Sequence, residues 1–174
     1  ATTETGSGNW VLNGMASEGL SADTHGIHRG HAGVVYRAGR FGFDAQMQFE
    51  GWAPWQPQER GISALGIGAG AGLRAAVTGD RFRGLYVAVG GTYLRFVGTP
   101  NEKILGANFA LEPNVFVARA GIGYGFAAAE TTTVAVRLDL NKSFITVIDP
   151  IPERPDAAPN PLSFHLGLEF LYWA

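Results

Sequence analysis

The chain has 174 residues, which fits a single domain and is enough to bury a core or close a barrel. A net charge of -2, with only two lysines, gives no electrostatic case for a nucleic-acid partner, and the lack of cysteine excludes disulfides, thiolate nucleophiles and cysteine-ligated zinc. Charged residues make up 16% against a usual value of about 25%, and 25 glycines are about twice the average, so something other than water is expected to face much of the surface.

The apolar stretches are too short for transmembrane helices. Leu65 to Leu73 and Ala120 to Ala129 reach about half the length that a spanning helix needs, and both are rich in glycine. The chain begins Ala1-Thr2-Thr3 without an initiator methionine, which suggests that a leader has been removed and that the protein is exported.

Alternation with a period of two recurs along the chain and predicts β-strands. It is weaker in Asn9 to Glu18 and Gly30 to Arg37, and clearest in Phe41 to Glu50. There, one face of the predicted strand carries Phe43, Ala45, Met47 and Phe49, and the other carries Asp44, Gln46, Gln48 and Glu50.

Five more strands are predicted beyond that segment. Leu65 to Leu73 alternates with glycines and Arg74, whereas Phe82 to Val97 has apolar residues on both faces, so its orientation stays open. The last three segments alternate clearly and run over Phe116 to Tyr124, Thr131 to Asn141 and Ser163 to Trp173.

The connections between these strands alternate between short and long. Three are hairpin-sized, at Ala38 to Arg40, Thr78 to Arg81 and Ala127 to Glu130, and the last of these sets Arg119 beside Arg137 or Asp139. The longer ones are Gly19 to Arg29, Ala53 to Arg60, Gly98 to Ala107 and Val147 to Pro161. The fold class is therefore all-β, an eight-stranded antiparallel up-and-down barrel spanning about residues 9–173 of one domain, 1–174.

Charge balance indicates which face of the barrel points inward. The polar face carries four arginines (Arg37, Arg74, Arg119 and Arg137) and four acids (Asp44, Glu50, Asp139 and Glu169). An enclosed lumen must neutralise its charges, because unpaired buried ions are costly, whereas a solvated surface needs no such balance. The aliphatic face is then the outer one.

Aromatic residues sort to the two ends of the aliphatic face. One belt, near the short turns, contains Trp10, Tyr36, Phe43, Tyr124, Phe126, Phe170 and Tyr172. The other, near the long connections, contains Phe49, Trp52, Phe109, Phe116, Phe144 and Phe164. Two aromatic belts that bracket an aliphatic band are typical of a wall in a bilayer.

In strand count, loop alternation and aromatic belts, the chain resembles the eight-stranded outer-membrane β-barrels of Gram-negative bacteria, the family of the OmpA transmembrane domain and OmpX. The last strand, Phe164 to Trp173, is similar to the C-terminal strand that the outer-membrane assembly machinery reads, although Ala174 follows the final aromatic residue. The resemblance implies residence in the bacterial outer membrane, with periplasmic short turns and extracellular long loops.

A barrel of this size has a lumen just wide enough for its own side chains, so the lumen charges are expected to form a structural plug. The predicted network comprises Arg37, Asp44, Glu50, Arg74, Arg119, Arg137, Asp139, His165 and Glu169. The alternative is a narrow pore, whose conductance would change when Glu50 or Arg119 is replaced.

Two further groups of residues have the types required for chemistry, but not a spacing that supports it. His25, His28 and His31 could converge on one metal ion only in a folded-back loop, so no firm metal site and no cofactor is predicted. Ser163, His165 and Glu169 share one strand face, but residues two apart stand too far from each other for a nucleophile–base hydrogen bond unless a side chain reaches back. No enzymatic activity is predicted.

The last long connection holds five of the nine prolines, which stiffen it into a candidate binding element. The candidate contact residues in the loops are Trp55, Pro152, Arg154 and Pro155. The predicted function is structural support, anchoring or partner binding through the loops or the outer wall. The expected partners are outer-membrane lipid, lipopolysaccharide and another envelope or surface protein. Transport of a small molecule is the alternative, and a soluble ligand-binding barrel the third possibility.

Overall fold

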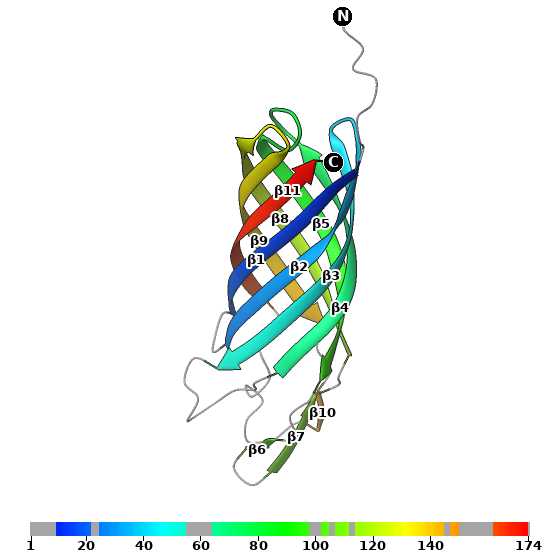
Figure 1. Cartoon of the computed structure of the whole chain (residues 1–174). Helices are drawn as coiled ribbons and strands as arrows, with labels where there is room; N and C mark the ends of the chain where they lie inside the picture. The colour runs from blue at the N-terminus through cyan, green and yellow to red at the C-terminus, as the bar shows by residue number, and fades with distance from the viewer. Residues whose placement is uncertain are drawn as a thin grey trace, which may run out of the picture.

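The computed structural model describes residues 10–21, 25–54, 64–97, 102–104, 107–111, 114–144, 147–149 and 162–173. Eight of its strands close into one antiparallel barrel (Figure 1). Each barrel strand pairs with the barrel strands before and after it in the chain, and the first pairs with the last. These are β1 (Trp10–Ser21), β2 (His25–Ala38), β3 (Phe41–Pro54), β4 (Ala64–Ala76), β5 (Gly84–Val97), β8 (Asn114–Ala129), β9 (Thr132–Phe144) and β11 (Leu162–Trp173). No helix in the described ranges is long and apolar enough to cross a membrane.

A second, small sheet lies beyond one end of the barrel. It contains β6 (Glu102–Ile104), β7 (Ala107–Leu111) and β10 (Val147–Asp149), in the order β10-β7-β6. Figure 1 places it at the end opposite to the one where β11 finishes. Pairing of β7 with β10 joins the segment that follows β5 to the one that follows β9. Part of the predicted connection Val147 to Pro161 is thus tied by backbone hydrogen bonds to β7, which lies mostly beyond the predicted connection Gly98 to Ala107.

The register of the barrel fixes its width. Cross-strand partners followed once round the barrel from Trp10 lead back to Leu20, ten residues further along β1. Eight strands with this stagger tilt by about 40° and enclose a space that side chains alone can fill. The lumen is therefore a packed interior, and its contents decide what the barrel can do.

Tight turns join the strands at the other end. Gly39, with a φ of 62°, supplies the left-handed conformation that the two-residue hairpin between β2 and β3 requires. The turn between β8 and β9 is centred on Glu130 and Thr131, later than predicted, and a bulge between Ala127 and Ala129 precedes it. As a result Arg119 pairs with Asn141, and not with Arg137 or Asp139 as the sequence suggested.

Strand alternation separates an apolar outer wall from a polar lumen. On β11, even-numbered residues such as Leu166 are about half exposed, whereas odd-numbered ones such as His165 are buried. The orientation of β5, left open by its sequence, places Tyr86, Leu94 and Phe96 inward and Tyr93 outward. The prediction of an eight-stranded all-β barrel is confirmed.

One connection differs from its prediction. Most of the expected first long loop, Gly19 to Arg29, belongs to strands: β1 continues to Ser21 and β2 already begins at His25. The glycines and histidines of this segment suggested a loop, but cross-strand pairing with β1 and β3 holds it extended. The extension brings Arg29 into the barrel wall, where its side chain is buried, as is that of His31 within the predicted strand.

Candidate functional site

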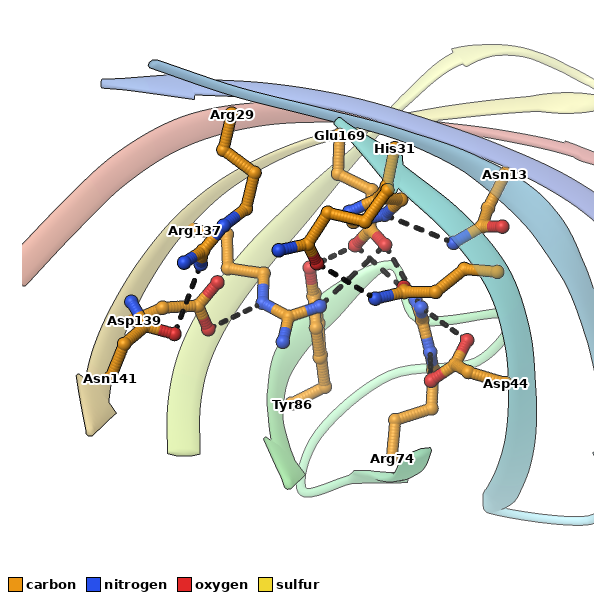
Figure 2. A network of polar contacts seen from close by, with 12 residues as sticks. Asn13, Arg29, His31, Asp44, Arg74, Tyr86, Arg137, Asp139, Asn141 and Glu169 are labelled. Atoms are coloured by element: carbon orange, nitrogen blue, oxygen red, sulfur yellow. Dashed lines mark hydrogen bonds and ion pairs between the residues drawn. The ribbon is translucent and has the colours of Figure 1, made fainter. Parts of the chain in front are cut away.

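The lumen holds a layered set of ionisable side chains whose interactions define the candidate site. Among the described residues, the buried charged side chains are four arginines and four acids: Arg29, Arg74, Arg119, Arg137, Asp44, Glu50, Asp139 and Glu169. The predicted balance of four against four therefore holds, with Arg29 in the place expected for Arg37. Figure 2 shows most of this network viewed from close by.

Arg74 is the centre of the cluster nearer the short turns. Its Nε and Nη2 donate to the two oxygens of Asp44 at 3.1 and 2.6 Å, and its Nη1 and Nη2 donate to Glu169 at 3.2 and 2.9 Å. Tyr86 donates its hydroxyl to the same Glu169, which also lies 3.7 Å from Nη1 of Arg137. Charge-assisted forks of this kind are among the strongest polar contacts in proteins. They join β3, β4, β5, β9 and β11 across the barrel.

Arg137 extends this cluster toward the middle of the lumen. Its Nε donates to Asp139 Oδ1 at 2.8 Å on the same strand, because residues two apart on a strand point to the same side. Asp139 lies opposite Gly121 on β8, and a Cβ at Gly121 would come within 1.8 Å of the Asp139 carboxylate. Glycine at this position makes room for the charged pair inside a narrow lumen.

A second cluster lies nearer the long-loop end. Arg29 donates from Nε and Nη2 to Glu50 Oε2 at 2.9 and 2.7 Å, and from Nη1 to Asn141 at 3.0 Å. Gln48 donates to the same oxygen of Glu50 at 3.0 Å and accepts from Thr92 at 3.1 Å. The Arg29 and Glu50 side chains are at most 2% exposed, so this ion pair is not shared with bulk water.

Arg119 lies between these two clusters and differs from the other lumen arginines. Within the described part of the chain, no carboxylate comes within salt-bridge distance of it. The amide of Gln46, oriented with its oxygen toward Arg119, accepts from Nη1 and Nη2 at 3.1 and 3.0 Å, while Nε has no hydrogen-bond partner. All four lumen acids are engaged by the other three arginines, so the charge of Arg119 is balanced only at longer range.

An apolar layer closes the lumen at the short-turn end. It contains Val11, Val35, Phe82, Tyr86, Ala135, Leu171 and Trp173. Phe82 comes from the turn between β4 and β5 and stacks on Trp173, with ring centroids 6.2 Å apart, while the Arg74 guanidinium lies 5.3 Å from the Phe82 ring. Phe82 and its neighbour Arg81 have positive φ values of 54° and 51°, which non-glycine residues rarely adopt. The packing of Phe82 into the barrel end offsets this strain.

Arg37 does not belong to the lumen network, contrary to its prediction. It follows the inward parity of β2 but lies beyond the apolar layer, where its guanidinium pairs with Asp80 and covers the face of Trp173 at 5.6 Å. The other predicted network residues lie in the lumen, including His165, which is buried. The candidate loop residues Trp55, Pro152, Arg154 and Pro155 lie outside the described residues.

Two of the three histidines near the start of β2 point to opposite sides of the barrel wall. His28 points outward and pairs with Glu18, whereas His31 is buried in the lumen beside Asn13, because residues three apart on a strand face opposite sides. The structure describes nothing of the His25 side chain. Across the described residues, no group of three potential ligands could hold a metal ion.

The Ser163–His165 pair corrects the distance argument made from the sequence. The two side chains lean together, and Ser163 Oγ lies 3.0 Å from His165 Nε2. The acid considered with them, Glu169, is instead occupied by Arg74 and Tyr86. His165 Nδ1 has no hydrogen-bond partner in the structure, so the pair lacks the carboxylate that orients the base in a serine–histidine–acid triad.

Several residues of the lumen network were not predicted from the sequence. The predicted strand Gly30 to Arg37 begins one residue after Arg29, and its alternation continued by that one residue places Arg29 inward. Tyr86 was not predicted because its strand has apolar residues on both faces, so the inward face could not be identified from the sequence. Asn13 and Asn141 carry no charge and gave no signal in a count of ionisable residues.

The outer wall is apolar over most of its area. Large hydrophobic side chains are exposed on all eight barrel strands, among them Leu12, Tyr36, Met47, Ile67, Val89, Ile122, Leu138 and Leu168. A soluble protein rarely exposes a continuous apolar surface of this extent. On β11 the two aromatic belts, at Phe164 and Tyr172, lie eight residues apart, which corresponds to about 20 Å along the barrel axis. This spacing is close to the height of a transmembrane apolar band.

Comparison with solved structures finds the same architecture. The chain is similar to Neisserial surface protein A (TM-score 0.58, 9% identity, 97% of this chain and 99% of that chain). It is also similar to OprG from Pseudomonas aeruginosa (TM-score 0.54, 11% identity, 95% and 96%) and to PagL (TM-score 0.52, 12% identity, 93% and 99%). No protein-family model and no curated protein matches the sequence. The resemblance to eight-stranded outer-membrane barrels is confirmed at the level of fold, and the expected outer-membrane localisation agrees with it.

The comparison also corrects one expectation. The structure of PagL is described as that of an outer membrane enzyme, so this barrel fold carries enzymes as well as other proteins. The prediction that the chain has no enzymatic activity is therefore wrong as an inference from the fold, because function resides in particular sites and not in the barrel itself.

Proposed function

We propose that the protein is an outer-membrane barrel with a closed lumen that acts as an anchored scaffold, binding its partners through the long-loop end and the outer wall. The observation that carries this proposal is the filled lumen. Arg74, Arg137, Glu50, Gln48 and His165 are all less than 2% exposed, which supports a lumen filled by its own side chains. The apolar layer around Phe82 and Trp173 adds a second barrier at the short-turn end.

The long-loop end supports the binding role. Tight turns leave little surface at the other end, while β6, β7 and β10 build an additional sheet beyond the barrel at this one (Figure 1). Backbone pairing between β7 and β10 holds two connections together, which lowers the entropic cost of docking a partner. The partners proposed are outer-leaflet lipid, including lipopolysaccharide, along the wall and another envelope or surface protein at the loop end.

Two measurements test the proposal. Planar-bilayer recordings of the purified barrel are expected to show no conductance steps. Reproducible conductance steps whose size differs between the wild type and the Glu50→Gln or Arg119→Gln variant would instead support the transport alternative. Native mass spectrometry of the protein extracted in mild detergent is expected to show a complex with a partner protein. Its mass should exceed that of the 18.5 kDa chain together with any bound lipid. The complex should be lost when residues 55–63 and 150–161 are replaced by short glycine–serine linkers. A complex that survives this replacement would contradict binding through these loops.

A further inference from the structure

Charged side chains on the outer wall gather at one end of the barrel. Among the described outward-facing residues, those with an acidic or basic side chain on the barrel strands are Glu18, His28, Arg95 and Lys142. All four lie in the part of their strand nearer the long loops, at the level of the aromatic residues Phe49, Tyr93, Phe116, Phe144 and Phe164. Elsewhere on the described part of the wall, the outward side chains carry no charge.

Two of these charges have no counter-charge among the described residues. Glu18 and His28 pair with each other. No described residue brings a carboxylate within salt-bridge distance of Arg95 or Lys142, although both are exposed on the wall. Cations at a membrane interface are stabilised when the lipid supplies the anion, so an unpaired arginine and lysine at this depth indicate an anionic head group beside them.

The strand register places the two cations on either side of an aromatic surface. Arg95 on β5 faces Asn114 on β8, and Lys142 on β9 faces Ala118 on the same β8. Between them lies Phe116, whose cross-strand neighbours are Tyr93 on one side and Phe144 on the other. The cations stand two strands apart, roughly 10 Å across the sheet, and are offset by four residues of β8, roughly 13 Å along it, so their Cα atoms are about 16 Å apart before the long side chains are counted.

Side-chain contacts show how this surface is shaped. Lys142 Nζ lies 5.3 Å from the centre of the Phe144 ring, and Phe144 is two residues nearer the long-loop end, so the ammonium group is directed toward the head-group region. The Phe116 and Phe144 rings are 5.9 Å apart. A Cβ at Gly91 would come within 2.5 Å of the Phe116 ring, so the glycine leaves a shallow place in which this ring lies against the wall. Acyl chains can pass over these rings and continue down the aliphatic band.

We propose that Arg95, Phe116 and Lys142 form a binding site for a phosphorylated glycolipid of the outer leaflet, with one phosphate bound at each cation and an acyl chain over the aromatic surface. The arginine can take a phosphate through two parallel N–H donors, and the lysine acts as a point charge. The inference rests on the proposed outer-membrane residence and names one lipid contact of the outer wall.

The test uses the full chain, folded in an uncharged detergent with EDTA so that divalent cations do not bridge phosphates. Native mass spectrometry measures binding of bisphosphorylated lipid A and of the same lipid with its phosphates removed. The wild-type protein is expected to bind the phosphorylated lipid at least tenfold more tightly. Arg95→Gln and Lys142→Gln should each weaken binding about fivefold, and the double variant about 25-fold, because a basic residue at the surface contributes about a factor of five and the two sites are independent.

Arg40→Gln is the matched control. Arg40 is an exposed arginine in the hairpin between β2 and β3, at the opposite end of the barrel, and its replacement also removes one positive charge. It should leave lipid A affinity within twofold of wild type. Barrel folding of each variant is verified by its heat-dependent mobility on a denaturing gel.

Three results would overturn the site. Equal affinity for the dephosphorylated lipid would show that phosphate is not recognised, and an equal loss in Arg40→Gln would show that net charge alone matters. Binding of inorganic phosphate with the same dependence on Arg95 and Lys142 would show a small-anion site and not a lipid site. Membrane residence is tested separately by fractionation. If the barrel sediments with outer membranes but shows no preference for the phosphorylated lipid, the lipid site is disproved and the proposed membrane residence is not.

Discussion

Replacement of Arg74 by glutamine is expected to destabilise the barrel more than replacement of any other lumen arginine described here. Arg74 donates four hydrogen bonds to Asp44 and Glu169 and lies over the rings of Phe82 and Tyr86. Without it, the cluster near the short turns would hold three carboxylates and the single cation of Arg137. Removal of one partner from a buried ion pair costs about 3–5 kcal/mol, because the remaining charge is buried without compensation.

Arg119→Gln is the control for this experiment. It removes the same charge from a residue of similar burial, but no described carboxylate contacts Arg119, so no acid loses a partner within salt-bridge distance. We expect a change of less than about 1 kcal/mol, since a hydrogen bond to a neutral amide contributes only about that much. Urea unfolding in detergent micelles or lipid vesicles, followed by tryptophan fluorescence and gel mobility, measures both variants under the same conditions.

A double variant separates the two explanations of a large effect. If Arg74→Gln destabilises through its stranded acids, then Asp44→Asn in the same chain should recover part of the loss, because Glu169 keeps its contact with Arg137. Equal destabilisation by Arg74→Gln and Arg119→Gln, or no recovery in the double variant, would refute the argument that contact ion pairs hold the lumen together.

Three further predictions follow from local geometry. Phe82→Ala should cost about 2–4 kcal/mol in urea unfolding, because the buried ring is lost while alanine keeps the Cβ that strains the positive φ, and a neutral result would contradict its role in the apolar layer. Gly68→Ala should cost about 1–3 kcal/mol, because its Cβ would approach a backbone oxygen to 1.9 Å, whereas Gly51→Ala, with open space around it, should stay within about 0.5 kcal/mol. Calorimetric titration with zinc should give no heat above buffer, since His28 and His31 face opposite sides of β2; saturable binding would show that ligands other than this pair converge.

The architecture could be predicted from the sequence because each face of the barrel has its own solvent. On β3, β9 and β11, lipid outside and paired charges inside require a strict alternation of residue types. The observed strands include the alternating segments of the sequence. The prediction is weakest on β5, where Val89 faces lipid and Leu94 faces the lumen. A lumen that is partly apolar removes the contrast on which the pattern depends.

The contacts inside the lumen could not be predicted in the same way. The pairing of Arg74 with Glu169 joins strands that are not neighbours in the barrel, so it depends on side chains reaching across the interior and not on any spacing in the sequence. The position of Arg119 opposite Asn141 depends on where one tight turn is centred and on one bulge. Such details are set by packing within a narrow barrel, which sequence alternation does not encode.

Arginine has two different energetic roles in this protein, and the difference indicates where a ligand can act. Arg29, Arg74 and Arg137 are buried with carboxylates from the same chain, so an external anion would have to displace a partner that is already held at hydrogen-bond distance. Arg95 lies on the wall at the depth of the membrane interface, where burial is partial and no described acid competes for it. Desolvation of an incoming phosphate is also less costly there than in the closed lumen. These three arginines of the lumen therefore stabilise the barrel, while the basic residues of the wall are left available to the lipid that surrounds it.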